Sequence, residues 1–529
     1  MTNYNVDISG DHNDLHVFQN SSGATVSETG LLSDGQSVNL GIMQNNINEL
    51  DSSVNALELQ INGVFDNAKL KADLQTVLAN IRSVVPGTDN ISVGYFRKNI
   101  LETVHDGSNN ADNRYDIRSM GKSIVGMAYW NAYSMGLIGD PYTKVSAILQ
   151  SDDSDKIVIP AGDFDISQVN LDPSAATIQD VSNELLICHL LTEANGMGYR
   201  NADLVVGGSN WYTKTGVNLD YDVSMNTTAY FNAILADKLL TSPLGTNSYG
   251  TGHSMLAVLL RNTYNNQKST SLTVEGVLNK LVFEPLGIAD GVKFYLKDTP
   301  DDGKLNGTNS VDLSTGVITA NVDSILSFRT YAEQAGNGIA ARNADLLKLF
   351  AVVAHNGVNP ETNVRVFKST AVENFLNYNC FGDDLFEQFK ETFKYAPQNR
   401  IKTVAANPND SDPTTQFYQS GDCLYFDSGM AKWYKNNRST IAVFHGTNDL
   451  PGARGWSGLM GGQFTFWPTR EYGVVVNVGH HLLTLADGQT IKPGVFITTV
   501  SKFNLTDSDG VVTNTSVQQL IMSTFAKHV

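Results

Sequence analysis

The sequence predicts a mixed α/β (α+β) domain that is preceded by a short N-terminal coiled coil. Two stretches have the apolar alternation and the turns of paired strands, one beginning at Ile91 and the other running from Arg454 to His481. Several helical patterns lie between them. Before them, apolar residues repeat at spacings of three and four. We therefore divide the chain into residues 1–38, residues 39–66 and a domain over residues 67–529.

Residues 1–38 form an N-terminal arm that is rich in Asn, Ser, Gly and Asp. The arm has too few apolar residues to bury a core of its own. We expect it to become ordered only against a partner chain or another part of a larger assembly.

Residues 39–66 carry an apolar seam of about four heptads. The seam consists of Leu40, Met43, Ile47, Leu50, Val54, Leu57, Ile61 and Val64. This spacing predicts a short parallel coiled coil that joins copies of the chain through residues 40–64, with a trimer favoured over a dimer. A single amphipathic helix packed on the globular domain would show the same periodicity, so both interpretations stay open.

The domain begins with a helix and two strands. Residues 67–84 have an apolar stripe at helical spacing, which Pro86 and Gly87 end. From Ile91, the sequence ISVGYFRKNILETVH predicts two strands joined by a turn. A helical pattern follows that runs to Ile138.

Further helices are expected in the middle of the domain. Their patterns lie within residues 185–199, 239–260, 281–295 and 336–357, the last after a loop, and each includes glycine or proline punctuation. The stretch from Arg454 to His481 predicts two or three adjacent strands with a turn at Arg470 and Glu471. An amphipathic helix closes the chain.

Ser119 and Lys122 stand where a strand-like segment turns into a helix. Residues three apart at the start of a helix project from the same face, so an amine would lie beside a hydroxyl. A buried lysine can take the proton of a serine and make it a nucleophile. The helix N-terminus would stabilise an oxyanion near the Ser119 amide. A capped helix with an exposed lysine has the same Ser-x-x-Lys pattern, so the motif alone is not decisive.

The charge balance excludes some classes of partner. The formal net charge is −18 at pH 7, which disfavours nucleic acid and anionic membranes because both need a basic surface. No apolar run approaches the length of a membrane span. We see no signal peptide at the N-terminus, and the sequence leaves the location open between the cytoplasm and an extracellular particle such as a virion.

No cofactor or metal site is predicted. The three cysteines, Cys188, Cys380 and Cys423, are far apart and odd in number, which does not suggest a disulfide framework. His480 and His481 are adjacent but lack further ligands at suitable spacing.

The order of five segments resembles the superfamily of serine β-lactamases and penicillin-binding proteins. These segments are SMGK, YGTGHSMLAVLL, EPLGI, GNGIAARNADLLKLF and WSG, within residues 89–479. The most similar branch includes class C β-lactamases, family VIII carboxylesterases and 6-aminohexanoate-oligomer hydrolases. The resemblance implies a β-lactamase/transpeptidase-like fold, with an antiparallel sheet flanked by helices and an all-helical subdomain.

The resemblance also implies roles for individual residues. It makes Ser119 the nucleophile, Lys122 its base and Tyr249 the proton relay, and it places the oxyanion hole at the N–H groups of Ser119 and Leu459. The residues expected along the substrate are Thr251, Trp456, Ser457 and Gly458. The segments EPLGI and GNGIAARNADLLKLF are implied to be structural, without a part in the chemistry.

The chain departs from the family pattern at two of these positions. Trp456 stands where the lactamases and peptidases have a cation that binds a substrate carboxylate, which favours ester or amide substrates lacking that carboxylate. Arg454 is a candidate substitute for this cation. Thr251 replaces the usual amide or hydroxyl partner and can still form hydrogen bonds, with fewer donors than an amide.

Two functions follow as hypotheses. The first is a serine hydrolase that acts through an acyl-enzyme on a small-molecule or peptide substrate. The second is a structural or host-attachment protein of a virion or tail fibre that contacts other virion proteins and carries a β-lactamase-like domain. The two are compatible, since an appendage can bear a hydrolase.

Overall fold

The computed structural model describes the globular part of the chain in pieces. The described residues are 65–85, 91–106, 111–149, 185–191, 205–206, 209–210, 226–228, 231, 252–296, 300, 302–305, 308–312, 318–321, 331–336, 338–378, 431–432, 454–457, 462–468, 471–477, 481–484, 490–491 and 503–528. Ala68–His528 forms one compact unit. Residues 1–38, the predicted coiled coil over residues 40–64, and Tyr249, Thr251, Gly458 and Leu459 lie outside the described residues.

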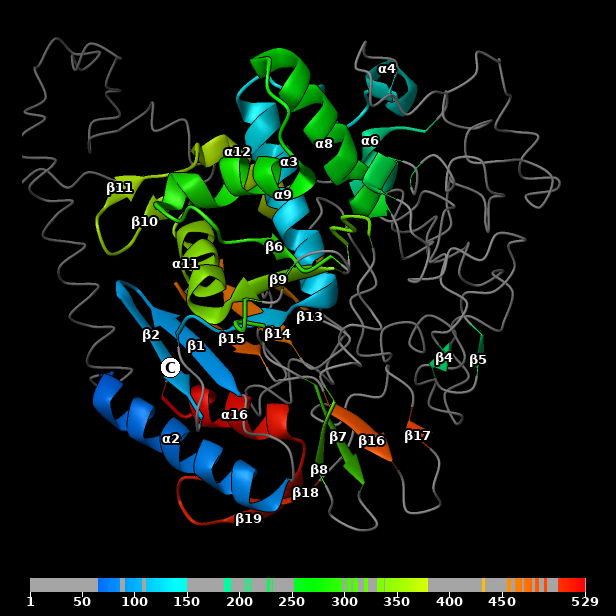
Figure 1. Cartoon of the computed structure of the whole chain (residues 1–529). Coiled ribbons are helices and arrows are strands. Elements are labelled where there is room, and N and C mark those ends of the chain that lie inside the picture. Colours follow the sequence, from blue (N-terminus) through cyan, green and yellow to red (C-terminus); the bar gives the residue numbers. More distant parts are fainter. Residues whose placement is uncertain are drawn as a thin grey trace, which may run out of the picture. The chain divides into compact units, whose positions relative to one another are not determined.

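A six-stranded antiparallel sheet forms the centre of this unit (Figure 1). In spatial order its strands are β12 (Ala431–Lys432), β13 (Arg454–Ser457), β14 (Gln463–Trp467), β15 (Tyr472–Asn477), β1 (Ser92–Arg97) and β2 (Ile100–His105). The two predicted groups of strands are confirmed. They join where β1 pairs with β15, with Ser92 opposite Asn477 and Arg97 opposite Tyr472.

Helix α11 (Asn343–Ala354) covers one face of the sheet. The ring of Phe350 stacks on Phe464 with their centroids 3.7 Å apart. Phe96 and Phe466 lie on the same face above Gly473, where a Cβ atom would be 2.5 Å from Phe466 and 2.6 Å from Phe96. A glycine as the second residue of β15 therefore gives the two aromatic rings the room to pack.

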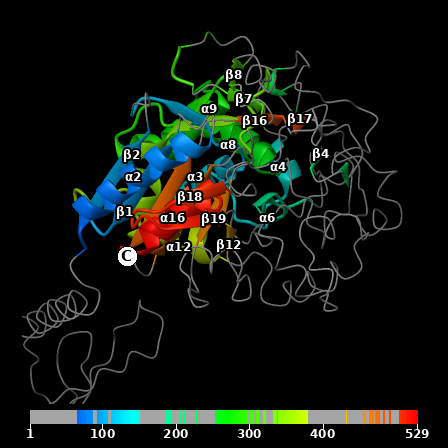
Figure 2. The same ribbon diagram turned by 90° about the horizontal axis from the view of Figure 1, so that it is seen from below.

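Helices α16 (Val517–Ala526) and α2 (Asn67–Val84) lie on the opposite face, side by side in Figure 2. Phe525 of α16 packs against Tyr95 and Tyr472, with centroid distances of 6.2 and 6.0 Å. The predicted helix over residues 67–84 is confirmed, and its apolar stripe is buried. Its Asp73 carboxylate lies 2.8 Å from Nε2 of His528, just beyond α16.

A group of helices lies beyond α11 (Figure 1). Helix α3 (Gly121–Ser134) is buried nearly all round, as its apolar sequence requires. It packs against α8 (Gly252–Lys268) and α12 (Ser369–Asn377), as well as the turn η2 (Asn279–Phe283). The shorter helices in this group are α4 (Val145–Leu149), α6 (Ile187–Leu191) and α9 (Val274–Leu278).

A small sheet contains β3 (Arg114–Asp116), the strand just before the turn that carries Ser119. Its strands in spatial order are β3, β9 (Ile339–Arg342) and β6 (Lys293–Phe294). The prediction of a loop before α11 was wrong here, because residues 339–342 form a strand paired on both sides. Four residues are too few to show a periodicity in the sequence.

The remaining strands form a four-stranded sheet and short hairpins. The sheet contains β17 (Thr490–Ile491), β16 (His481–Thr484), β7 (Thr308–Asp312) and β8 (Ile318–Asn321). The hairpins are β4–β5 (Val205–Val206 with Ser209–Asn210), β10–β11 (Val358–Asn359 with Val364–Arg365) and β18–β19 (Phe503–Thr506 with Val512–Thr515).

No helix within the described ranges is long and apolar enough to cross a membrane. Over the same residues, His, Cys, Asp and Glu side chains nowhere gather in a group of three or more that could bind a metal ion. The turn before β19 has two aspartates, and Lys527 Nζ lies 2.8 Å from Asp507 and 2.7 Å from Asp509. One ammonium thus pairs with both carboxylates and offsets half of their charge.

Candidate active site

Ser119 and Lys122 lie together at the start of α3. Ser119 belongs to η1 (Arg118–Met120), a short 3₁₀ turn, whereas Lys122 is in the first turn of the helix. Ser119 Oγ and Lys122 Nζ are 3.4 Å apart. Ser119 is 7% exposed and Lys122 is fully buried. The predicted shared face of the two residues is therefore present, and the lysine is not on the surface as in a merely capped helix.

Lys122 has a second neighbour that the sequence did not reveal. Its Nζ donates a hydrogen bond to the carbonyl oxygen of Gly336, at 2.8 Å. Gly336 lies in GNGIAARNADLLKLF, which the resemblance implied to be purely structural. That expectation was incomplete, because this segment positions the lysine. A backbone carbonyl leaves no mark in a sequence, so pattern analysis has no signal for such a contact.

Gly121, between the serine and the lysine, allows this close approach. A Cβ atom at position 121 would lie 2.7 Å from the carbonyl oxygen of Ala335 and 3.0 Å from the side chain of Ile339. Any larger residue would push this backbone away from α3. The glycine in SMGK is therefore explained by the backbone that packs against it.

Strand β13 lies beside η1, so the Trp-Ser-Gly segment begins next to Ser119. Trp456 is 3% exposed and packs edge-on against His253 of α8, with centroids 5.7 Å apart and planes at 85°. Arg454 donates from Nε to the carbonyl oxygen of Leu376 at 3.2 Å. The backbone of Ser457 ends β13, and its side chain is outside the described part of the structure.

The residue before the serine has an unusual backbone conformation. Arg118 has a φ of 47°, in the left-handed region that residues other than glycine seldom adopt. Asp116 stabilises it at two points. The carboxylate accepts the Arg118 backbone N–H at 3.1 Å and lies 2.9 Å from the guanidinium Nη2. We infer that this turn sets the direction in which the chain enters η1.

Exchanging Arg118 for glycine or alanine tests how much of this conformation is strain. A left-handed residue with a Cβ costs about 1–2 kcal/mol, so Arg118→Gly should be about 1 kcal/mol more stable than Arg118→Ala. Both variants lose the guanidinium contact with Asp116 and keep the backbone N–H that its carboxylate accepts, which makes their comparison matched. Chemical denaturation measures the difference, and an alanine variant as stable as the glycine variant would contradict the strain.

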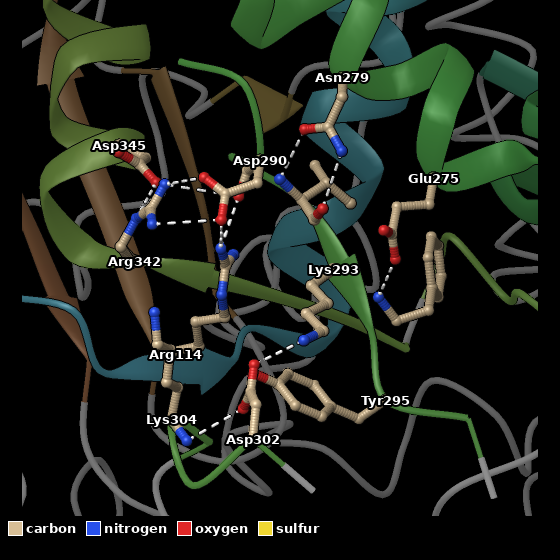
Figure 3. A network of polar contacts seen from close by, with 12 residues as sticks. Arg114, Glu275, Asn279, Asp290, Lys293, Tyr295, Asp302, Lys304, Arg342 and Asp345 are labelled. Atoms are coloured by element: carbon tan, nitrogen blue, oxygen red, sulfur yellow. Dashed lines mark hydrogen bonds and ion pairs between the residues drawn. The ribbon is translucent and has the colours of Figure 1, made fainter. Parts of the chain in front are cut away.

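A network of charges fixes β3, the strand that leads into the site (Figure 3). Arg114 of β3 is 1% exposed and donates from Nη2 to both the carboxylate and the carbonyl oxygen of Asp290, at 2.6 and 2.7 Å. Arg342 of β9 binds the same carboxylate at 2.6 Å, and its Nε binds Asp345 of α11 at 2.6 Å. The network thus links β9 and α11 to β3, which ends shortly before Ser119 in the sequence.

The carboxylates of this network differ in their pKa values. Burial alone would raise the pKa of Asp290, but the hydrogen bond to Arg342 and the charges of both arginines outweigh it and lower the pKa. Burial dominates at Asp345 and raises its pKa although Arg342 opposes the change. The positive charges of Arg114 and Arg342 balance the negative charges of Asp290 and Asp345.

A buried histidine in the helical group should make stability depend on pH. His189 of α6 is 1% exposed, and its Nδ1 accepts the Leu186 N–H at 3.0 Å. Burial lowers its pKa to about 4. In the unfolded chain His189 binds a proton near pH 6.5. The contribution of the buried neutral His189 to the stability of the fold is therefore complete above that pH and is lost as the pH falls toward 4.

Between pH 6.5 and 4, His189 should lower the free energy of unfolding by about 3 kcal/mol. His189→Asn retains an acceptor for the Leu186 N–H without a group that titrates, so it should be less sensitive to acid between pH 6.5 and 4. Unfolding midpoints at a series of pH values give the comparison. Equal slopes for the two proteins would exclude His189 as the cause.

Comparison with known proteins finds a similar fold among solved structures. No protein-family model and no curated protein sequence matches the chain. Among solved structures, simvastatin synthase from Aspergillus terreus (LovD6 mutant) is similar over 87% of this chain and 96% of its own, with 14% identity and a TM-score of 0.52. The likeness extends over nearly all of that enzyme.

Two further solved structures are similar at lower scores. EstCE1, a hydrolase with promiscuous acyltransferase activity, is similar over 78% of this chain and 93% of its own, with 14% identity and a TM-score of 0.49. A family VIII carboxylesterase is similar over 78% and 92%, with 14% identity and a TM-score of 0.47.

The central sheet, the helical group and the similarity to the synthase together define the fold of the domain. The domain has the β-lactamase/transpeptidase-like fold that the sequence predicted. At this level of identity the likeness establishes the fold alone, so the activity has to be argued from the site.

Proposed function

We propose that this chain is a serine hydrolase that forms an acyl-enzyme on Ser119 and cleaves an ester, amide or peptide bond. The observation that carries the proposal is the 3.4 Å approach of Ser119 Oγ to the fully buried Lys122 Nζ. A serine hydroxyl attacks poorly at neutral pH unless a neighbouring base takes its proton. A buried amine at this position is such a base.

The hydrogen bonds of Lys122 suit this role. In its neutral form the amine can donate to the Gly336 carbonyl and direct its lone pair at the Ser119 hydroxyl. The Oγ proton then moves to Nζ while Oγ bonds to the carbonyl carbon of the substrate. The backbone N–H groups of Ser119 and Leu459 donate to the resulting oxyanion.

Two further steps complete the reaction. The proton on Lys122 passes to the leaving group, with Tyr249 as the relay, and the bond to the leaving group breaks. Water then attacks the acyl ester on Ser119, releases the acid and restores the hydroxyl. The roles of Tyr249 and Leu459 rest on the sequence, since both lie outside the described residues.

The proposed substrates lack a carboxylate next to the scissile bond. Trp456 carries no charge, and the Nε of Arg454 is used by the Leu376 carbonyl. We place Thr251, Ser457 and Gly458 along the substrate, as the motifs imply. A short-chain ester should therefore be a better substrate than a penicillin.

Labelling by a fluorescent fluorophosphonate tests the proposal directly. The wild type should be labelled and Ser119→Ala should not, because the reagent bonds only to an activated nucleophile. Ser134→Ala is a matched control, since Ser134 is on α3 but its Oγ donates to the Asn131 carbonyl, away from the site. This variant should be labelled as fast as the wild type.

Turnover of nitrophenyl esters and of a fluorescent penicillin is measured with the same proteins. Labelling that persists in Ser119→Ala would assign the nucleophile to another residue. A folded wild type with neither labelling nor ester turnover would contradict the proposed hydrolase, and circular dichroism establishes the folded state.

A further inference from the structure

The backbone at Gly336 is fixed from two sides. Its N–H donates to Ser254 Oγ of α8 at 2.7 Å, and its carbonyl oxygen accepts from Lys122 Nζ at 2.8 Å. Ser254 is 2% exposed and Lys122 is fully buried, so water does not compete readily for either bond. One residue of backbone therefore connects a serine on α8 with the lysine on α3.

The peptide group between Ala335 and Gly336 has contacts at both ends. Its N–H is the one that Ser254 accepts, while its oxygen, the Ala335 carbonyl, packs against Gly121. A peptide group is planar and rigid, so these two contacts fix its orientation. The next carbonyl, which binds Lys122, is separated from this plane only by the φ and ψ angles of Gly336.

Those two angles belong to the most permissive residue type. Glycine samples conformations that are closed to residues with a Cβ, so without its N–H contact the Gly336 carbonyl would have more freedom. The hydrogen bond to Ser254 removes part of this freedom. The position of the lysine amine is thus linked to the Ser254 side chain through the backbone of Gly336.

We propose that Ser254 is a positioning residue that acts through Gly336 to place the amine of Lys122 against Ser119. The inference deepens the proposed function and rests on it. A displacement of a reacting group by about 1 Å can lower a rate by about 10²-fold. The loss of the Ser254 hydroxyl is expected to act in this way on acylation.

The same segment offers a matched control. Three residues earlier, the Glu333 N–H donates to Thr227 Oγ1 at 3.0 Å, again from a backbone amide to a buried hydroxyl. Glu333 itself accepts the N–H groups of Val274 and Glu275 at the start of α9. Thr227→Val therefore loosens the segment without touching the bond that positions Lys122.

The experiment compares wild type, Ser254→Ala, Ser254→Thr and Thr227→Val. In Ser254→Ala, kcat for an ester and the rate of fluorophosphonate labelling should fall by about 10²-fold with KM unchanged. Ser254→Thr keeps the hydroxyl and should recover most of the rate. Thr227→Val should lower the unfolding temperature but leave kcat within about twofold of wild type.

Hydrogen exchange of the Gly336 amide provides a readout that does not depend on activity. Exchange should be slow in wild type and in Ser254→Thr, and faster in Ser254→Ala. If wild type is labelled and Ser254→Ala is labelled at the same rate, the inference fails while the hydrolase stands. An equal loss of kcat in Thr227→Val would also overturn it, and an unlabelled wild type would overturn both proposals.

Discussion

Replacing Lys122 with methionine is expected to lower the rate of acylation of Ser119 by about 10³-fold while the protein remains folded. Methionine is similar in length to lysine and suits an apolar interior. It cannot accept the proton of Ser119 Oγ, 3.4 Å away, and it gives up the hydrogen bond to Gly336. The substitution should therefore slow the chemical step of acylation.

Single-turnover labelling measures this rate without the later steps. Lys280→Met is the matched control, because Lys280 is exposed and pairs with Glu284 on the surface of the helical group. Its labelling rate should equal that of wild type. A Lys122→Met protein that is labelled at more than a tenth of the wild-type rate would remove the lysine from the proposed mechanism.

Replacing Gly121 with alanine is expected to destabilise the protein by about 1–3 kcal/mol and to slow acylation. The new Cβ would lie 2.7 Å from the Ala335 carbonyl oxygen, and a backbone atom cannot rotate away as a side chain can. The segment must shift, and Gly336 shifts with it. The Lys122 amine would then lose its fixed position, which links the stability loss to the rate.

Gly276→Ala serves as the control for a glycine near the start of a helix. A Cβ there would lie 3.2 Å from the Cβ of Leu272, a milder approach than the 2.7 Å at Gly121, and alanine favours the helix by about 1 kcal/mol. Its unfolding midpoint should be close to that of wild type or above it. A Gly121→Ala protein that is as stable as Gly276→Ala would show that the backbone at Ala335 can shift without a loss of stability.

Those elements of the fold that have a local signal were predicted from the sequence. Residues 67–84 carry a stripe long enough to identify α2, and the strands from Ile91 and Arg454 are joined by recognisable turns. The closing helix was predicted from its amphipathic spacing, and the structure shows that it begins at a capping box of Ser516 and Gln519. Each of these signals depends on residues close together in the chain.

Two features of the site that were missed depend on residues far apart. Nothing in the sequence indicates that the Gly336 carbonyl meets Lys122, or that the Gly336 N–H meets Ser254. One missed feature is local: the left-handed conformation of Arg118, whose partner Asp116 is two residues away, was not foreseen because an arginine does not mark a left-handed position in a sequence. The Ser119–Lys122 pair was found because the two residues are only three apart in the chain.

The pairing of β1 with β15 has a consequence for how the chain reaches its fold. β1 finds β2 at once through a tight hairpin, but its other neighbour comes from the far end of the domain. During synthesis at about 5–20 residues per second, the edge of β1 stays unpaired until residues 472–477 have left the ribosome. Closing so long a loop is slow, and an open strand edge is a template for association with other chains. The central sheet therefore stays incomplete for most of the synthesis of the domain. Until the last part of the chain has been made, pairing of β1 with another chain competes with folding.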